Sequence, residues 1–171
     1  MARRIVAVTT LTPTATADTT ALANGTYPFG LQGGSGTQLN KIWEVSISGQ
    51  AASSSSPTFM LLSRDSTVGT GANTNGTGVT DAALDPATAA LGAPVLSGNI
   101  FATTQSQRSS TLHLANCSLN AFGGVYFWRA NRQEECFSVL GNTASLGEAS
   151  LSAFTGGTTG AIGAHMIYES L

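Results

Sequence analysis

The sequence is poor in charge, and this shortage excludes two classes of protein. Only 9% of its 171 residues are Asp, Glu, Lys or Arg, whereas about a quarter of the residues are charged in ordinary soluble proteins. Seven basic residues stand against nine acidic ones, and Lys41 is the single lysine. So few cations cannot form the basic surface that nucleic-acid binding requires. With 42% hydrophobic residues and a net charge of -2, the chain also lacks the composition of a charge-rich disordered protein.

Long apolar runs and export signals are missing as well. No run approaches the roughly 18 apolar residues that a membrane-spanning helix needs. Arg3 and Arg4 precede an apolar stretch at residues 5–8, which is shorter than the about 7–15 residues of a signal-peptide core. We therefore expect neither a membrane span nor export by that route. Cys117 and Cys136 are then expected to be reduced thiols, although a disulfide between adjacent strands stays open.

Motifs that carry catalysis are also absent. No glycine-rich loop ends in a lysine, and the glycines between residues 69 and 78 do not form a dinucleotide-binding fingerprint. His113 and His165 are the only histidines. Together with Cys117 and Cys136 they are residue types that bind zinc, but the paired short spacings of structural zinc sites are missing. We expect no enzymatic activity, no cofactor and no metal.

Small polar residues dominate instead, with 20 Gly, 19 Ser and 23 Thr. Short β-type runs recur between clusters of Gly, Asn and Ser, which is typical of antiparallel sandwiches and barrels. The predicted strands are residues 5–10, 41–48, 58–63, 111–117, 123–130, 134–140, 148–154 and 164–169. Short connections favour antiparallel neighbours. We predict one all-β domain over residues 1–171, an antiparallel β-sandwich of jelly-roll-like topology, with an N-terminal strand or arm at 1–10.

Two local features refine this prediction. In the strand 41–48, alternation places Trp43, Val45 and Ile47 on one face, opposite Glu44, Ser46 and Ser48. A turn at residues 131–133 predicts that 123–130 and 134–140 form a hairpin.

A long polar insertion is predicted over residues 64–98. Its first part is almost entirely Thr, Gly, Asn and Ala, a composition typical of loops that are mobile or held by a partner. Its second part contains Asp85 as a helix N-cap, Pro86 at the first helical position and Gly92 just past the end. This pattern predicts one short helix of one to two turns.

Two predicted strands are apolar on both faces. In 123–130, Val125 and Phe127 alternate with Tyr126 and Trp128; in 164–169, Met166 and Tyr168 alternate with His165 and Ile167. A half-exposed antiparallel strand normally alternates apolar with polar residues. If one face fills the core, the other needs a cover, which is either the insertion, a neighbouring subunit or a ligand.

The C-terminal part of the chain resembles a group of viral proteins. Residues 134–148, 154–158 and 165–169 resemble small proteins of tailed bacteriophages, and residues 63–67 and 83–91 fit the same pattern. In kind, the chain is similar to the β-sandwich decoration or cement proteins that bind phage capsids. The resemblance implies a virion component assembled in the host cytoplasm. It also implies a dimer or trimer whose partner is the major capsid protein.

The sequence thus leads to a structural protein that binds the outside of a phage capsid and stabilises it. The alternative is a carbohydrate- or receptor-binding module of a phage tail or fibre, in which Trp43, Tyr126, Trp128 or Tyr168 would stack on sugars. Candidate interface residues are Arg3, Arg4, Ile5 and Val6 of the arm, and Tyr126, Trp128, Met166 and Tyr168 of the double-faced strands. Neither nucleic acid nor membrane is an expected partner.

Overall fold

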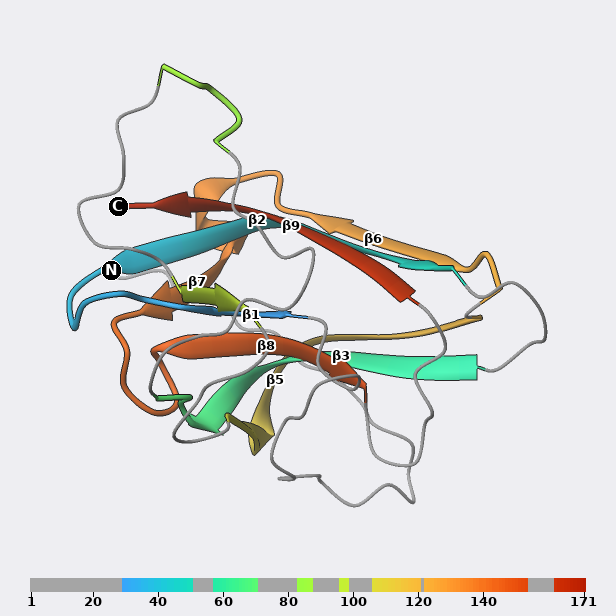
Figure 1. Ribbon diagram of the computed structural model, residues 1–171, viewed down its shortest axis with the longest axis horizontal. Helices are drawn as coiled ribbons and strands as arrows, with labels where there is room; N and C mark the ends of the chain where they lie inside the picture. Colours follow the sequence, from blue (N-terminus) through green and yellow to red (C-terminus); the bar gives the residue numbers. More distant parts are fainter. Residues whose placement is uncertain are drawn as a thin grey trace.

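The computed structural model describes residues 29–50, 57–70, 83–87, 96–98, 106–120, 122–153 and 162–171. Within these ranges the chain forms nine strands and one short 3-10 helix (Figure 1). The strands are β1 (Phe29–Gln32), β2 (Leu39–Gly49), β3 (Pro57–Thr67), β4 (Leu96–Gly98), β5 (Gln107–Asn120), β6 (Val125–Arg129), β7 (Phe137–Leu140), β8 (Glu148–Ala153) and β9 (Ile162–Ser170), and the 3-10 helix η1 is Gln133–Glu135.

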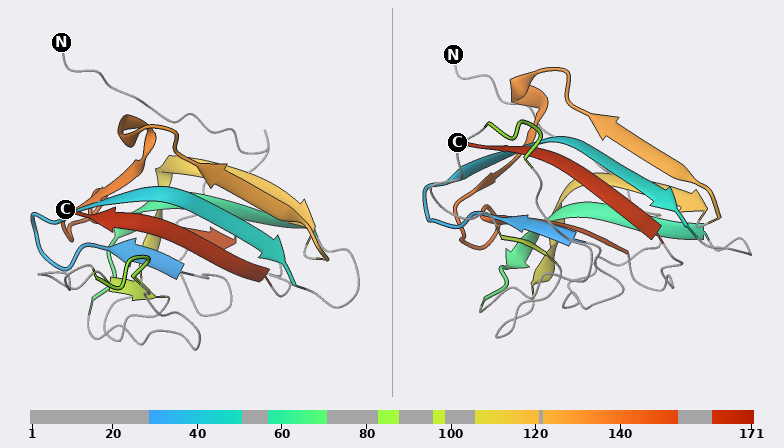
Figure 2. Two further views of the ribbon diagram at one scale, coloured as in Figure 1. Left: turned by 90° about the horizontal axis from the view of Figure 1, so that it is seen from above. Right: turned by 45° about the horizontal axis from the view of Figure 1, so that its top comes forward.

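The strands form two sheets, which Figure 1 shows as two layers. Sheet A has the order β4-β1-β8-β3-β5. Sheet B is built around β2, which pairs with β9 on one side and with β6 and β7 in succession on the other (Figure 2). Every strand pair is antiparallel. The prediction of an antiparallel all-β chain is therefore confirmed.

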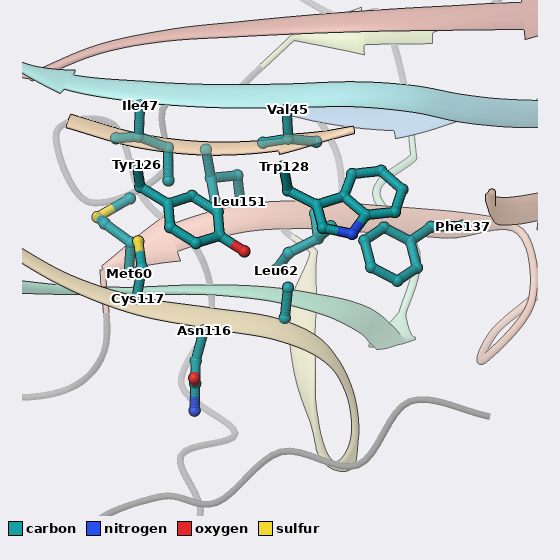
Figure 3. A pocket seen from close by; sticks show the side chains of 11 residues that line it. Val45, Ile47, Met60, Leu62, Asn116, Cys117, Tyr126, Trp128, Phe137 and Leu151 are labelled. Atoms are coloured by element: carbon teal, nitrogen blue, oxygen red, sulfur yellow. The ribbon is translucent and has the colours of Figure 1, made fainter. Parts of the chain in front are cut away.

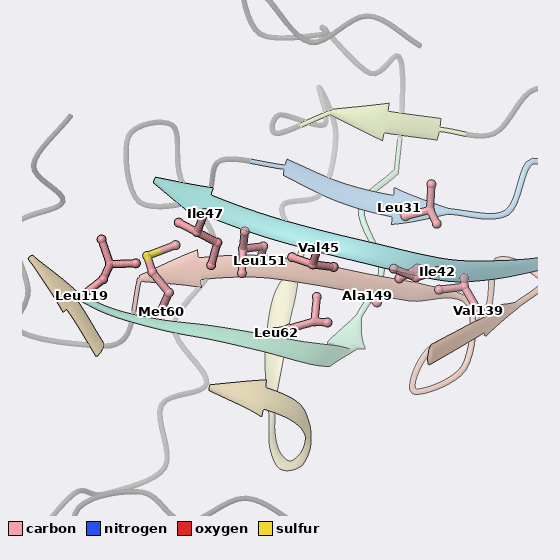
Figure 4. Close-up of a cluster of buried hydrophobic side chains, with 10 residues drawn as sticks. All are labelled: Leu31, Ile42, Val45, Ile47, Met60, Leu62, Leu119, Val139, Ala149 and Leu151. Carbon is pink, nitrogen blue, oxygen red and sulfur yellow. The ribbon is translucent and has the colours of Figure 1, made fainter. Parts of the chain in front are cut away.

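The hydrophobic core fills the space between the two sheets (Figure 4). Val45 and Ile47 of β2 meet Met60 and Leu62 of β3 and Leu151 of β8, and all five side chains are buried. Each such side chain contributes about 1.5–3 kcal/mol by leaving water. Ile42, Leu31, Leu119, Val139 and Ala149 complete the cluster. Facing apolar rows of two twisted sheets thus give the chain its core.

A β-bulge in β2 corrects the predicted face of Trp43. The pairing of β2 with β9 shifts between Ile42 and Glu44, so Ile42 rather than Trp43 joins Val45 and Ile47 in the core. Trp43 is half-buried, and its carbonyl oxygen accepts a hydrogen bond of 2.8 Å from the backbone of Ala130. An extra residue in one strand of a pair turns every earlier side chain to the other face.

The predicted hairpin of residues 123–140 is wrong. β6 pairs with Glu44–Ser48 and β7 pairs with Leu39–Ile42, so both strands lie along the same edge of β2. The turn between them, which includes η1, carries the chain forward instead of reversing it. Within this turn, the backbone of Asn131 donates a hydrogen bond of 3.1 Å to the side chain of Glu135. Arg129, at the end of β6, lies near Glu44 of β2.

The predicted insertion begins too early and ends too late. β3 continues through Thr67 in pairing with β5, and Leu96–Gly98 forms β4, which pairs with β1. β1 itself was not predicted. Asp85 accepts a 2.9 Å bond from the Ala87 backbone, and residues 83–87 form a turn without a helix. Residues 88–92 of the predicted helix and the predicted strand 5–10 lie outside the described residues.

Two crossovers between the sheets touch each other at one end of the molecule. The loop from β1 to β2 meets the loop from β7 to β8, where the Gly33 amide donates to the Gly141 carbonyl at 3.1 Å and the Gly141 amide donates to Gln38 at 2.8 Å. A Cβ on Gly33 would lie 2.3 Å from the Gly141 oxygen. Glycine is required here because two backbones approach closely.

We predict that Gly33→Ala lowers the free energy of unfolding by at least about 2 kcal/mol, because the methyl group separates the two loops. Urea denaturation followed by tryptophan fluorescence measures this loss. Gly36→Ala is the matched control, because no atom lies within 4 Å of a Cβ at that position. Equal stability of the two variants would contradict the described contact between the loops.

Candidate functional site

The strand β6 presents one row of side chains to the core and the other to solvent. Tyr126 and Trp128 pack against the core, whereas Val125 is 72% and Phe127 is 57% exposed. No part of the chain that the structure describes covers these two apolar side chains. Exposed apolar side chains on one strand are a recognised mark of an interaction surface.

The exposed row of β6 continues across sheet B. Phe127 pairs with Ser46 of β2, which pairs in turn with His165 of β9. The neighbouring rows are Arg129, Glu44 and Ile167 on one side, and Val125, Ser48 and Gly163 on the other. We call this surface, which faces away from sheet A, the outer face of sheet B.

Leucines occupy the opposite end of this face. Leu39 of β2 pairs with Leu140 of β7, and its carbonyl oxygen accepts a 2.8 Å hydrogen bond from the backbone of Leu171. Leu140 and Leu171 are 46% and 59% exposed. The outer face therefore carries apolar side chains at both ends.

The charges between the two apolar ends balance one another. Glu44 lies 3.9 Å from Nε of Arg129 and 3.7 Å from Nδ1 of His165, and Lys41 pairs across the strands with Glu169. Exposed pairs of this kind contribute little stability, about 0–1 kcal/mol each. Their effect is to leave the outer face without net charge when His165 is neutral.

The residues predicted to form an interface on β6 and β9 lie on the inward face of sheet B. Tyr126, Trp128, Met166 and Tyr168 pack against the core, so their side chains are not free to meet a partner. Their neighbours Val125, Phe127 and His165 face solvent instead. Alternation identified both rows of β6 but not which one is inward. Arg3, Arg4, Ile5 and Val6 lie outside the described residues.

A narrow gap lies between the sheets where β6 faces β5 (Figure 3). Tyr126 and Trp128 of β6 point toward Met60, Leu62 and Cys117 across it. The Trp128 ring stacks on Phe137 with centroids 4.1 Å apart. The gap has room for about one water molecule, which makes it a loosely filled part of the core rather than a ligand groove.

The cysteines and histidines are not gathered into a reactive centre. Both cysteines are free, and burial raises the pKa of the Cys117 thiol to about 11, which keeps it protonated and weakly nucleophilic. Among the described residues, no three His, Cys, Asp or Glu side chains are placed to hold a metal ion. The same part of the chain contains no helix of the length and hydropathy that a membrane span requires.

No protein family matches the chain, and neither does any curated protein or solved structure. The outer face of sheet B is thus identified by its geometry and chemistry alone. Leu39, Leu140 and Leu171 were missed in the sequence because they stand at strand ends, where alternation with polar neighbours is short. Only the pairing of three distant segments brings them together.

We predict that Trp128→Ala lowers the free energy of unfolding by about 2–3 kcal/mol, because it removes a core side chain and its stacking on Phe137. Phe127→Ala, one residue away, is expected to change it by less than about 1 kcal/mol because that ring is exposed. Chemical denaturation of both variants measures the difference. The reverse order of stabilities would mean that the two faces of β6 are exchanged.

Proposed function

We propose that the chain is a structural virion protein of a tailed phage that binds the outside of the capsid and stabilises it. The observation that supports this proposal most is the outer face of sheet B, which has exposed apolar ends and internally balanced charges. Such a surface suits contact with another protein, since it gains from leaving water and requires no partner of opposite charge.

The finer fold that we propose is a jelly-roll-like β-sandwich. The first strands of the chain alternate in space with the last ones, because β8 lies between β1 and β3 in sheet A while β2 pairs with β7 in sheet B. This interleaving is what two nested Greek keys produce. A compact fold of this type suits a subunit that must present one face at many equivalent sites.

The major capsid protein is the partner that we propose for the outer face. Val125, Phe127, Leu140 and Leu171 would lose their exposure to water on docking, and each would contribute to the affinity. A capsid repeats the same site many times, so each contact can be modest. A dimer or trimer of this chain would add to the effect by engaging several sites at once.

A carbohydrate-binding module is the second candidate, and Phe127 is the residue that favours it. This exposed ring lies in one row with the Ser46 hydroxyl and the His165 imidazole. Sugar sites combine an aromatic face with such polar groups. Against it, Tyr126, Trp128 and Tyr168 pack against the core. Trp43, the remaining candidate ring, is half-buried and donates its Nε1 hydrogen to Glu169 at 3.2 Å.

We predict that the double variant Val125→Ser/Phe127→Ser binds pre-formed capsids of the phage at least about tenfold more weakly, because the apolar side chains at one end of the outer face are lost. Co-sedimentation with capsids measures the affinity. Leu112→Ser is the matched control, because Leu112 is 41% exposed and lies on β5 of sheet A. Undiminished capsid binding by the double variant, or glycan binding without capsid binding, would overturn the proposal.

We also predict that capsid binding depends little on salt, because the charges of the outer face compensate one another. Raising NaCl from about 0.05 M to about 0.5 M should change the affinity by less than about threefold. The same co-sedimentation assay at both salt concentrations tests this expectation. A steep loss of binding with salt would point to a charged surface elsewhere on the chain.

A further inference from the structure

Sheet A carries a row of four buried polar side chains on the face that points away from the core. Gln32 of β1 pairs with Glu148 of β8, and Asp65 of β3 pairs with Arg108 of β5. The pairing of Arg64 with Ala149 places Asp65 beside Glu148. Asp65 and Glu148 are 0% exposed, and Gln32 and Arg108 are 3% exposed. Buried charges in adjacent strands require an explanation, since each one is costly to remove from water.

Glu148 joins two segments that are distant in the sequence. Its Oε2 accepts a hydrogen bond of 2.9 Å from the Gly69 amide, and its Oε1 accepts one of 2.6 Å from the Ser106 hydroxyl. Gln32 reinforces the first contact by donating its Nε2 to the Gly69 carbonyl at 3.2 Å. Gly69 follows β3 and Ser106 precedes β5. One carboxylate therefore fastens both ends of the segment 70–105 to sheet A.

Asp65 lies against this carboxylate and lacks the partners of an ionised group. Its Oδ1 accepts a hydrogen bond of 2.5 Å from the Ser150 hydroxyl, whereas its buried Oδ2 receives no hydrogen bond. An ionised carboxylate oxygen without a donor is unfavourable in a dry site. A protonated Oδ2 beside Glu148 would instead donate a hydrogen bond, as in other pairs of carboxyls that share one proton.

We propose that Asp65 and Glu148 form a clamp closed by a single shared proton, which holds the Gly69 amide and the Ser106 hydroxyl on Glu148 and opens when that proton is lost. In the closed state, protonated Asp65 donates to Glu148, and Glu148 accepts from Gly69 and Ser106. When hydroxide removes the proton, two negative charges lie side by side in a buried site. Their repulsion opposes the geometry that the bonds to Gly69 and Ser106 require.

Arg108 is the charged residue that strand pairing places next to Asp65. Among the described residues, Arg108 of β5 faces Asp65, Gln32 of β1 is neutral, and Arg64 of β3 pairs with the core residue Ala149 on the opposite face. Arg108 donates its Nη1 to the Ser152 hydroxyl at 2.9 Å.

The direction of the pH dependence follows from this arrangement. Burial, followed by the charge of Glu148, raises the pKa of Asp65 well above the usual value of 3.8. Between the usual pKa of an aspartate and this raised pKa, Asp65 is thus protonated in the closed state and ionised in the open state. Closure is complete below the usual pKa of an aspartate and weakens as the pH rises toward the raised pKa.

Hydrogen exchange of the Gly69 amide, followed by NMR on the full chain, measures this opening. Exchange rates are corrected for intrinsic chemistry and compared with the Ala130 amide, which donates to Trp43 in sheet B at 2.8 Å. Between about pH 4 and about pH 10, we expect the protection of Gly69 to become pH-dependent and then to fall by up to about tenfold per pH unit, the limit for one linked proton. Ala130 should show no such fall.

Two variants separate the clamp from a purely structural role. Asp65→Asn carries a permanent N–H donor toward Glu148, so we expect protection of Gly69 that no longer depends on pH. Glu148→Ala removes both acceptor oxygens, so Gly69 should lose its protection even in acid while Ala130 stays protected. Glu169→Gln, an exposed carboxylate on sheet B, is the control and should behave as the unmodified chain does.

Two results would overturn the proposal. The first is a pH dependence of Gly69 exchange in Asp65→Asn that equals that of the unmodified chain. The second is protection of Gly69 in the unmodified chain that stays constant over the whole range. If either variant fails to fold, the Ala130 amide also loses its protection. The pH dependence of Gly69 exchange in the unmodified chain then decides whether the proposal holds.

Discussion

The packing of β2 against β3 and β8 is the contact on which the rest of the structure depends. Val45 and Ile47 can meet Met60, Leu62 and Leu151 only if one face of sheet B is turned inward along its whole length. Because side chains alternate along a strand, that choice also decides which residues face outward on β6 and β9. Tyr126 and Trp128 become core, and Phe127 and Val125 become surface.

The two outer faces created by this packing differ in their chemistry. On sheet A, Gln32, Asp65, Arg108 and Glu148 are buried. Glu148 accepts hydrogen bonds from Gly69 and Ser106, which lie at the two ends of the segment between β3 and β5. On sheet B, the apolar side chains of β6 remain exposed. A fold that has exposed apolar side chains on sheet B and buried polar side chains on sheet A presents different faces to a partner, which favours docking in one orientation. Such a restriction is what repeated, equivalent docking on a larger assembly requires.

The sequence allowed the strands to be predicted far better than their partners. Val45 and Ile47 were correctly expected to share a face, and residues 41–48, 58–63, 111–117 and 164–169 all lie in observed strands. Trp43 was placed wrongly because a bulge depends on how β9 pairs with β2, which local alternation does not reveal. The prediction of a hairpin at 131–133 was wrong because a turn signal in the sequence does not show whether the chain turns back to pair with itself or continues along the same neighbouring strand, here β2. Glu148 looks like a solvent-exposed residue in sequence, and only pairing with β1 and β3 shows that it is buried.

The shortage of charge takes on a different meaning when the few charges are located. A low charged fraction alone suggests a surface covered by neutral polar groups or by other subunits. In this chain Asp65, Glu148 and Arg108 are withdrawn into the outer face of sheet A, and Glu44 is shared between Arg129 and His165 on sheet B. The outer face of sheet A therefore buries part of the few charges, and charges of opposite sign lie close together on the outer face of sheet B. The outer face of sheet B is thus neutral and partly apolar, which favours association over exposure of that face to water.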